Sequence, residues 1–292
     1  DYNLKIEMKI GKNTDVKNKS LKTRKLATAY EPIRIFLDTT YLDIQAQTLP
    51  NIPENLPKIK RSLNKALDAM SKLLEVAQFA ENVYGDMNSG FFNEHKIEKW
   101  DEKLNNPEEI SENYDYVLLA RFDVESDGFP PEVLAAGMPI LLEEKTYRPI
   151  IGLMMISKSS SSFSKENAEH YFSNIFFHEL THGFGFLDGG YEYFPGGRKE
   201  TLLTKTDQYG IKRTYIKTPK VVELAKKYYG CDSADGVELE NQGTGGSALS
   251  HWEARALLGE YMTSEMYQDE IAISEFTLAL LEDSDWYKVN YY

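Results

Sequence analysis

The stretch that decides both fold and chemistry is His178-Glu179-Leu180-Thr181-His182, followed by Gly183-Phe184-Gly185-Phe186. Two histidines four residues apart on a helix lie on the same side, because four residues make just over one turn, so both imidazoles can reach one ion. Imidazole suits zinc, and a catalytic zinc takes three protein ligands and leaves one position for water. Glu179 would then act as a general base, which is the metalloprotease interpretation of this spacing.

The residues before the motif favour a helix. Between positions 167 and 177 apolar side chains recur at helical spacing, and no proline interrupts them. The competing interpretation is a buried helix with two structural histidines, which would place the carboxylate of Glu179 in an apolar run at a high cost in free energy. Gly185, three residues after His182, is where this helix is expected to end.

Length and composition predict an acidic, globular protein. The 292 residues carry 33 Lys and Arg against 46 Asp and Glu, and 41% of them are apolar, which is enough for a sizeable core. No basic cluster is dense enough to follow a phosphate backbone, so nucleic acid is not expected as a partner. No stretch has the apolar length of a membrane-spanning helix or of a signal peptide, so membrane association would come only through segments outside this chain. Cys231 is the single cysteine and cannot form an internal disulfide.

The chain before the motif predicts a sheet backed by a helix. Alternation over 32–42 predicts a strand whose buried face carries Ile33, Ile35 and Leu37. Apolar residues at three- and four-residue spacing over 59–77 predict a long amphipathic helix. Further strands are expected at 116–122 and 150–156, with a proline- and glycine-rich loop over 128–139 between them.

The chain after the motif predicts more loop than regular structure. Residues 188–214 and 236–246 are expected to be loops, Thr218-Pro219 begins a helix that Gly230 ends, and Ser274 begins a last helix. The predicted fold class is therefore α+β, with a mixed sheet, a backing helix and the active-site helix in an N-terminal lobe of residues 1–187. A loop-rich C-terminal lobe of residues 188–292 would face the same cleft.

Two histidines do not complete a catalytic zinc site, and the residues offer two candidates for a third ligand. Asp188 lies six residues after His182 and could reach the ion if the chain doubled back at Gly185. His251 lies beyond a 68-residue insertion, in a segment that glycines precede. Sequence distance alone leaves both open, although Asp188 precedes two glycines, where turn chemistry accounts for an aspartate equally well.

Several segments in the second half share the pattern of one protease family. The matching residues are His178-Glu179, His182, Gly185-Phe186, the segment 236–243, Gly246-Ser247, Ser250-His251-Trp252-Glu253 and Tyr261-Met262-Thr263. Over about residues 116–287 the chain resembles the leishmanolysin family of metzincin zinc proteases. The resemblance implies that His251 is the third zinc ligand, and that Met262, eleven residues later, forms a turn beneath a single zinc ion.

The resemblance also implies the function. It implies a zinc-dependent endopeptidase with Glu179 as general base, acting on protein or peptide substrates. We expect the substrate to lie in extended conformation along an edge strand at 150–156. The resemblance implies an extracellular or cell-surface location and roles in proteolysis and cell adhesion, although family members are rich in disulfides and this chain has only Cys231. Ser264 stands where some metzincins place a tyrosine ligand, so no oxyanion stabiliser is predicted. The alternative function is a surface binding module that keeps zinc for stability alone, which would need a fourth protein ligand.

Overall fold

The computed structural model describes residues 9–10, 29–50, 52–78, 84, 87, 89–159, 163, 166–242, 247–264 and 272–291. The chain divides into two compact units, one of Glu7–Phe184 and one that contains Gly185–Tyr292. They are called the N-terminal unit and the C-terminal unit below, and each is described by itself. Both contain helices and sheets, so the α+β class predicted from the sequence is confirmed.

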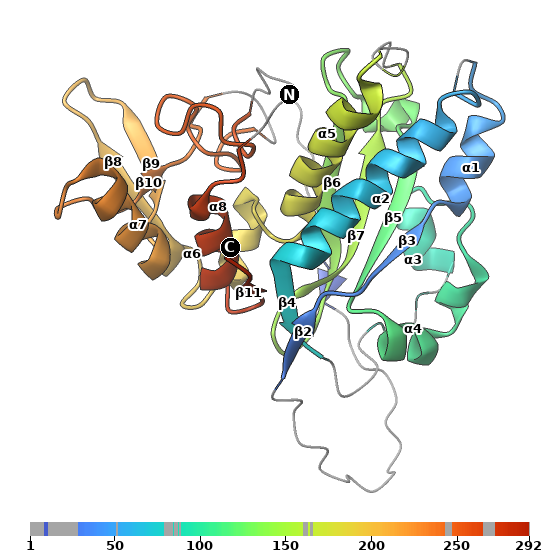
Figure 1. Ribbon diagram of the computed structural model, residues 1–292, viewed down its shortest axis with the longest axis horizontal. Helices are drawn as coiled ribbons and strands as arrows, with labels where there is room; N and C mark the ends of the chain where they lie inside the picture. The colour runs from blue at the N-terminus through green and yellow to red at the C-terminus, as the bar shows by residue number, and fades with distance from the viewer. Residues whose placement is uncertain are drawn as a thin grey trace, which may run out of the picture. The chain divides into compact units, whose positions relative to one another are not determined.

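A five-stranded mixed sheet forms the centre of the N-terminal unit (Figure 1). Its strands, in spatial order, are β1 (Lys9–Ile10), β6 (Ala135–Leu142), β7 (Pro149–Ile156), β5 (Tyr116–Phe122) and β3 (Ile35–Asp38). Only the β6–β7 pair is antiparallel. Every residue of β5 and β7 is buried, which is why both strands are apolar runs in the sequence that only Arg121 of β5 interrupts.

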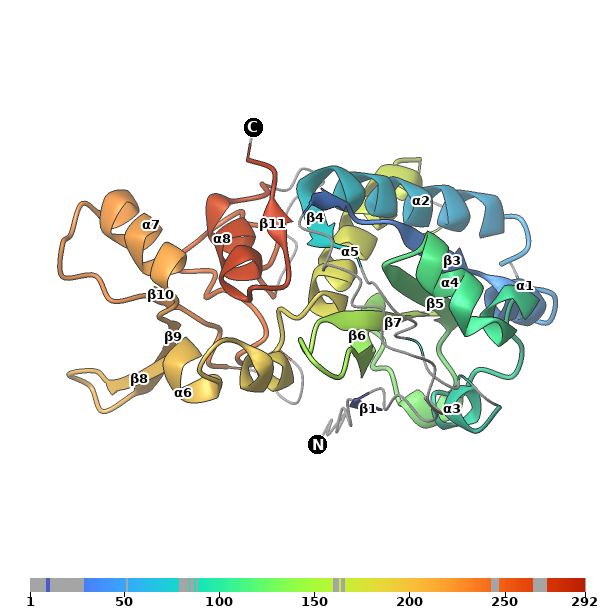
Figure 2. The ribbon, with the colours of Figure 1, turned by 90° about the horizontal axis from the view of Figure 1, so that it is seen from below.

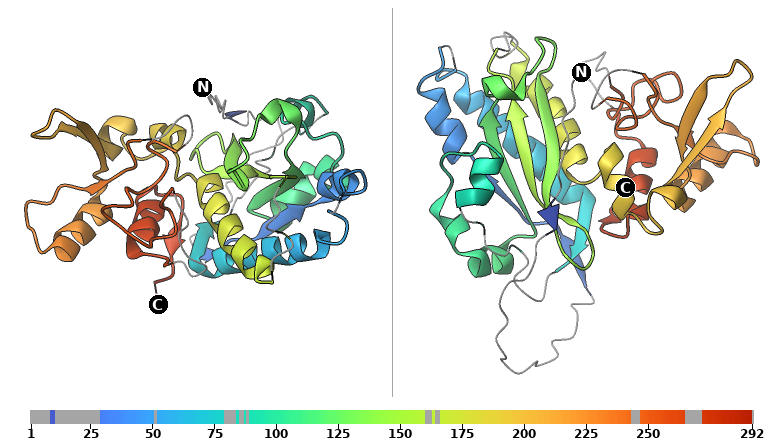
Figure 3. Two further views of the ribbon diagram at one scale, coloured as in Figure 1. Left: turned by 90° about the horizontal axis from the view of Figure 1, so that it is seen from above. Right: turned by 180° about the vertical axis from the view of Figure 1, so that it is seen from behind.

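Two long helices pack against each other on one face of this sheet, α2 (Leu56–Leu73) and α5 (Ala168–Gly183) (Figures 1 and 3). Helix α2 has a proline in its first turn and buries a stripe at three- and four-residue spacing, as its sequence predicts. Shorter elements complete the unit: β2 (Tyr30–Pro32), α1 (Thr40–Ala46), β4 (Leu74–Ala77), α3 (Ser89–Glu94), η1 (Glu102–Asn105), α4 (Pro107–Asn113) and η2 (Glu125–Asp127). β2 and β4 pair antiparallel.

Three expectations for this unit are wrong in detail. The helix expected over 59–77 ends at Leu73, and its last four residues form β4, because main-chain pairing with β2 replaces a further helical turn. The strand expected over 32–42 is β3, which ends at Asp38, and its buried residues are Phe36 and Asp38 rather than Ile35 and Leu37. The Asp38 carboxylate accepts the N–H of Thr40 at 2.8 Å, which stops the strand and begins α1.

The largest error concerns the loop expected over 128–139. Its second half is the start of β6, and Pro139 lies inside the strand, next to a register shift between Pro139 and Leu141. A proline is tolerated there because no described strand pairs with the outer side of β6 over this stretch, where the described residues of β1 pair with Leu141 and Leu142. Conversely, β7, which was expected to be an edge strand, lies between β5 and β6, so neither of its sides is open to a peptide.

The C-terminal unit is built around a three-stranded antiparallel sheet in the order β10-β9-β8 (Figure 2). Its elements are η4 (Asp188–Tyr193), α6 (Arg198–Thr201), β8 (Leu202–Thr206), β9 (Lys212–Ile216), α7 (Pro219–Tyr229), β10 (Val237–Glu238), α8 (Glu275–Asp283) and β11 (Lys288–Val289). Helices α7 and α8 pack against each other. Both were predicted, and α7 ends at Gly230 in the left-handed conformation. The β8–β9 hairpin was not predicted, because 188–214 was expected to be a loop.

Candidate active site

Helix α5 carries the His-Glu-x-x-His motif in its last two turns. Phe172, Ile175 and Phe176 are buried and anchor the helix by its apolar side. The helix ends at Gly183, where the N–H of Phe184 still donates to the carbonyl of Leu180 at 2.8 Å. Gly185 follows with φ of +114°, a conformation that residues with a side chain rarely adopt. The predicted helix and its stop are therefore both present.

A tyrosine from the sheet holds the end of this helix. The hydroxyl of Tyr116 on β5 donates to the carbonyl of Gly183 at 3.2 Å. A Cβ atom at Gly152 on β7 would lie 1.8 Å from this hydroxyl oxygen, and one at Gly183 would lie 2.7 Å from it. Burial raises the pKa of Tyr116 far above its ordinary value, so the phenol stays protonated and can donate. The last turn of α5 thus depends on two glycines that make room for one phenol.

The imidazoles of His178 and His182 point toward one position. Their Nε2 atoms lie 3.1 Å apart, the rings are nearly perpendicular at 81°, and both side chains are buried. Two nitrogens bound tetrahedrally to zinc at ~2.0–2.1 Å lie about 3.3 Å from each other. The spacing of the two nitrogens therefore fits a shared zinc ion, and imidazole nitrogen is a ligand that suits zinc.

Glu179 is held by the main chain of β6. The N–H of Gly137 donates to Oε2 of Glu179 at 2.7 Å. Desolvation raises the pKa of Glu179 above its ordinary value, and the Gly137 N–H opposes that rise. A Cβ atom at Gly137 would lie only 2.0 Å from the carbonyl oxygen of Glu179 and 2.8 Å from its Cβ. Only glycine at this position lets helix and strand approach closely enough for the hydrogen bond.

His251 belongs to the C-terminal unit and is also buried. Its main-chain carbonyl accepts the N–H of Glu240 at 2.9 Å, and its Nδ1 lies 3.0 Å from the carbonyl oxygen of Ser247. A carbonyl can only accept, so Nδ1 carries the proton and Nε2 carries a lone pair that could bind a metal. Burial lowers the pKa of His251 to about 4, which keeps the ring neutral at pH 7.

Met262 lies in a buried turn tied to the residue after His251. The N–H of Trp252 donates to the carbonyl of Met262 at 2.9 Å, and Met262 is fully buried. The carboxylate of Glu260 accepts the N–H of Met262 at 2.5 Å and the hydroxyl of Thr277 at 2.5 Å. Thr277 in turn accepts the indole N–H of Trp252 at 2.8 Å. Sequence analysis did not find Glu260 or Thr277, because only the fold brings α8 beside this turn.

The other candidate ligand is engaged elsewhere. The side-chain carboxylate of Asp188 accepts a hydrogen bond from Nη2 of Arg198 at 2.5 Å. The main-chain carbonyl of Asp188 accepts one from Nη1 of Arg198 at 2.8 Å. His170 is exposed beside Asn174, and the ring of His95 packs against Phe91. The candidate metal ligands are therefore His178 and His182 in the N-terminal unit and His251 in the C-terminal unit.

Comparison with known proteins places these residues in a family. The family model described as leishmanolysin matches residues 58–292 of the chain. The chain belongs to the leishmanolysin family. It is 32% identical over 195 residues to a leishmanolysin-like peptidase of Caenorhabditis briggsae, covering 55% of this chain and 29% of that protein. It is 50% identical over 74 residues to one of Drosophila pseudoobscura pseudoobscura, covering 25% of this chain and 11% of that protein.

A third relative carries another name. The ciliated left-right organizer metallopeptidase of Xenopus laevis is 31% identical over 158 residues, covering 51% of this chain and 21% of that protein. The chain thus spans less than a third of the length of these leishmanolysin relatives. Their printed names are those of peptidases and metallopeptidases, and membership of a metallopeptidase family implies a metal cofactor. None of the described helices is long and apolar enough to cross a bilayer.

Proposed function

We propose that this chain is the catalytic part of a zinc-dependent endopeptidase. One observation carries the proposal: in a member of the leishmanolysin family, α5 presents two convergent imidazole nitrogens 3.1 Å apart, with a carboxylate on the residue beside the first of them. Imidazole nitrogens at this spacing suit zinc, and an adjacent carboxylate suits proton transfer. We also propose that the chain has two lobes, residues 1–187 and residues 188–292. The support for this division is that one compact unit ends at Phe184 and the other continues from Gly185.

The ligands we assign to one zinc ion are His178, His182 and His251. All three are buried histidines, and the proton on Nδ1 of His251 leaves its Nε2 as the ligand atom. Asp188 is not assigned, because its carboxylate is paired with Arg198. Zinc bound there would supply positive charge that polarises the scissile carbonyl and makes a water molecule more acidic.

Glu179 is assigned as the general base. Its Oε2 is occupied by the N–H of Gly137, which leaves Oε1 to take a proton from the attacking water and to return it to the departing amine. The hydrogen bond fixes the carboxylate without a second side chain. Met262 is assigned as an apolar floor of the site, since its side chain is fully buried in a turn fastened by Glu260.

The peptide is assigned to the outer edge of β6 rather than to 150–156. No described strand pairs with the outer side of 135–139, and Gly137 in this stretch contacts Glu179. A substrate added there as an extended strand would run past the general base. This edge belongs to the same unit as His178 and Glu179, so the assignment needs no assumption about the C-terminal unit.

The alternative, a zinc site kept for stability alone, has less support. A structural zinc takes four protein ligands, and the described set that could hold a metal contains three residues. An extracellular or cell-surface location is also a proposal. It rests on family membership, and Cys231 is exposed, where a partner cysteine of another segment could reach it.

The test is a pair of measurements on the purified chain and on Glu179→Ala. Metal content by mass spectrometry should give one zinc per chain in both proteins, because Glu179 is not a ligand. Cleavage of a denatured protein substrate should fall by ~10²–10⁴ in the variant, the range for loss of a general base. A chain that binds zinc and cleaves nothing would favour the binding module, and loss of zinc in Glu179→Ala would overturn the assigned roles.

A further inference from the structure

The strand β8 has one open side. It is the edge of its three-stranded sheet, where β9 pairs with one side and no described strand pairs with the other. Two hydrogen bonds at the ends of the β8–β9 pair show which residues of β8 bond to β9. The N–H of Lys217 donates to the carbonyl of Thr201, and the N–H of Asp207 donates to the carbonyl of Ile211, both at 2.9 Å. Bonded and non-bonded pairs alternate along an antiparallel ladder, so every second residue from Thr201 faces β9.

The intervening residues face outward. Leu202, Thr204 and Thr206 therefore direct their carbonyls to the open side, and Thr204 and Thr206 also direct their N–H groups there. The N–H of Leu202 is already used by the carbonyl of Arg198. Thr204 and Thr206 are both exposed. An extended polypeptide could thus pair with up to five main-chain groups over the ~13 Å from Leu202 to Thr206.

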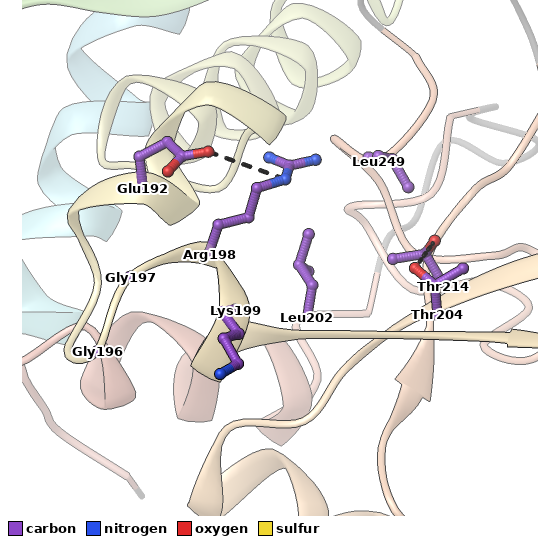
Figure 4. Close-up of a pocket in the computed structure, with 9 residues that line it drawn as sticks. All are labelled: Glu192, Gly196, Gly197, Arg198, Lys199, Leu202, Thr204, Thr214 and Leu249. Atoms are coloured by element: carbon purple, nitrogen blue, oxygen red, sulfur yellow. Dashed lines mark hydrogen bonds and ion pairs between the residues drawn. The ribbon is translucent and has the colours of Figure 1, made fainter.

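A pocket lies on the face of the hairpin that carries the side chains of these same residues (Figure 4). It has a volume of about 610 Å³, and its lining residues are Glu192, Gly196, Gly197, Arg198, Lys199, Leu202, Thr204, Thr214 and Leu249. The hydroxyls of Thr204 and Thr214 lie 3.0 Å apart across the two strands. Alternate side chains of a strand added to β8 would point to this face.

The charges around the pocket are mixed, in a chain whose net charge is -13. The lining includes Glu192 as well as Arg198 and Lys199, and Arg213, Lys217 and Lys220 nearby in sequence are already in ion pairs. Arg198 is paired with Asp188, and Lys205 with Asp235. Lys199 and Lys212 have no ion-pair partner among the described residues. Lys199 lines the pocket, and Lys212 lies opposite Thr206 at the other end of the same face.

We infer that the outer edge of β8 docks an extended acidic segment of a protein substrate, which adds to the sheet as a fourth strand. The choice of a substrate protein as partner rests on the proposed peptidase function. Acidic side chains at the first and fifth positions of the segment pair with Lys199 and Lys212. An aliphatic side chain at the third position enters the pocket between Leu202 and Leu249. Main-chain pairing supplies the binding, and the two lysines select the charge pattern.

The test measures binding of labelled peptides to the full chain carrying Glu179→Ala, which prevents cleavage. One peptide contains Glu-Thr-Val-Thr-Glu, and its matched control contains Gln-Thr-Val-Thr-Gln. Fluorescence anisotropy should show saturable binding of the first and at least about tenfold weaker binding of the second. Raising NaCl from about 50 to about 300 mM should weaken binding of the acidic peptide alone.

Variants test the two parts of the interaction separately. Lys199→Glu combined with Lys212→Glu should weaken binding about tenfold or more, whereas Lys226→Glu with Lys227→Glu, the same charge change on the exposed side of α7, should leave it within about twofold. Thr204→Pro removes an outward N–H and should also cost about tenfold or more. An acidic peptide N-methylated at alternate residues tests main-chain pairing without altering the protein, and should bind equally poorly.

Equal binding of the Glu and Gln peptides, or full binding by the Lys199 and Lys212 variant, would overturn the inference. So would a dimer in size-exclusion chromatography that Thr204→Pro abolishes, because the open edge would then belong to a second copy of the chain. The proposed function is judged separately by cleavage with the wild-type chain. Cleavage without binding of the acidic peptide removes only the docking site, whereas binding without cleavage removes the peptidase.

Discussion

Gly137→Ala should disable the general base without touching a charged group. An added Cβ would lie 2.0 Å from the carbonyl oxygen of Glu179. Ordinary van der Waals contact begins near 3.4 Å, so β6 and α5 must separate by more than about 1 Å locally. Such overpacking costs typically ~1–3 kcal/mol of folding free energy. The hydrogen bond from Gly137 to Oε2, now 2.7 Å, would stretch beyond bonding distance, and a ~1 Å misplacement of a catalytic group can cost ~10²-fold in rate.

The assay is kcat/KM on a quenched fluorescent peptide together with urea unfolding followed by circular dichroism. Gly210→Ala is the control: it forces a side chain into φ of +79°, but a Cβ there meets nothing within 4 Å. It should lower stability by about 1 kcal/mol and leave kcat/KM unchanged. If Gly137→Ala retained wild-type kcat/KM, or lost activity only in proportion to its unfolded fraction, the main chain of β6 would have no part in holding Glu179.

Three further predictions concern the C-terminal unit. His251→Ala should lose zinc and Asp188→Asn should keep it, as measured by metal content after dialysis; the reverse result would move the third ligand to Asp188. Met262→Leu nearly conserves volume and should cost less than ~1.5 kcal/mol in urea unfolding with zinc retained, so loss of metal from a folded variant would give the sulfur a role of its own. Burial raises the pKa of Glu260 from 4.5 to about 7. Between these two pH values Glu260 is therefore protonated in the folded state and ionised in the unfolded state. The stability that this group contributes therefore falls as pH rises from about 5 to about 7. Glu260→Gln does not ionise, so its free energy of unfolding should rise by up to ~3 kcal/mol relative to that of the wild type between pH 5 and 8. A difference in unfolding free energy that does not change with pH would contradict the shift.

Local patterns were enough for the motif helix, α7 and α8 and for the strands β5 and β7. The three helices each have a periodic apolar face or clear terminal residues, and the two strands are apolar runs that only Arg121 of β5 interrupts. The errors occur where tertiary pairing overrides a local signal. Pro139 and Gly137 are loop residues by propensity, yet an outer strand accepts the proline, and the close approach of α5 requires the glycine.

The residues of the candidate site also divide into those that local spacing predicts and those that only the fold reveals. His178, Glu179 and His182 follow from spacing on one helix, since the geometry of a helical turn is the same in every protein. Gly137 and Glu260 could not be found by spacing, because Gly137 acts through a hydrogen bond to a distant residue and Glu260 joins the Met262 turn to Thr277 on α8. A glycine in an otherwise apolar run at 135–142 was the one available signal for a close backbone approach.

The phenol of Tyr116 couples positions 116, 152 and 183, so that a substitution at one of them constrains the residues at the other two. Its hydroxyl fills the space that a side chain at Gly152 or Gly183 would need, and it donates to the carbonyl at the end of α5. Replacing either glycine expels the ring, while shortening the tyrosine leaves a void beside two glycines that nothing else fills. Library designs and sequence comparisons should therefore treat positions 116, 152 and 183 as a single unit of change. A phenylalanine at 116 is the one small step that keeps the shape and removes only the hydrogen bond.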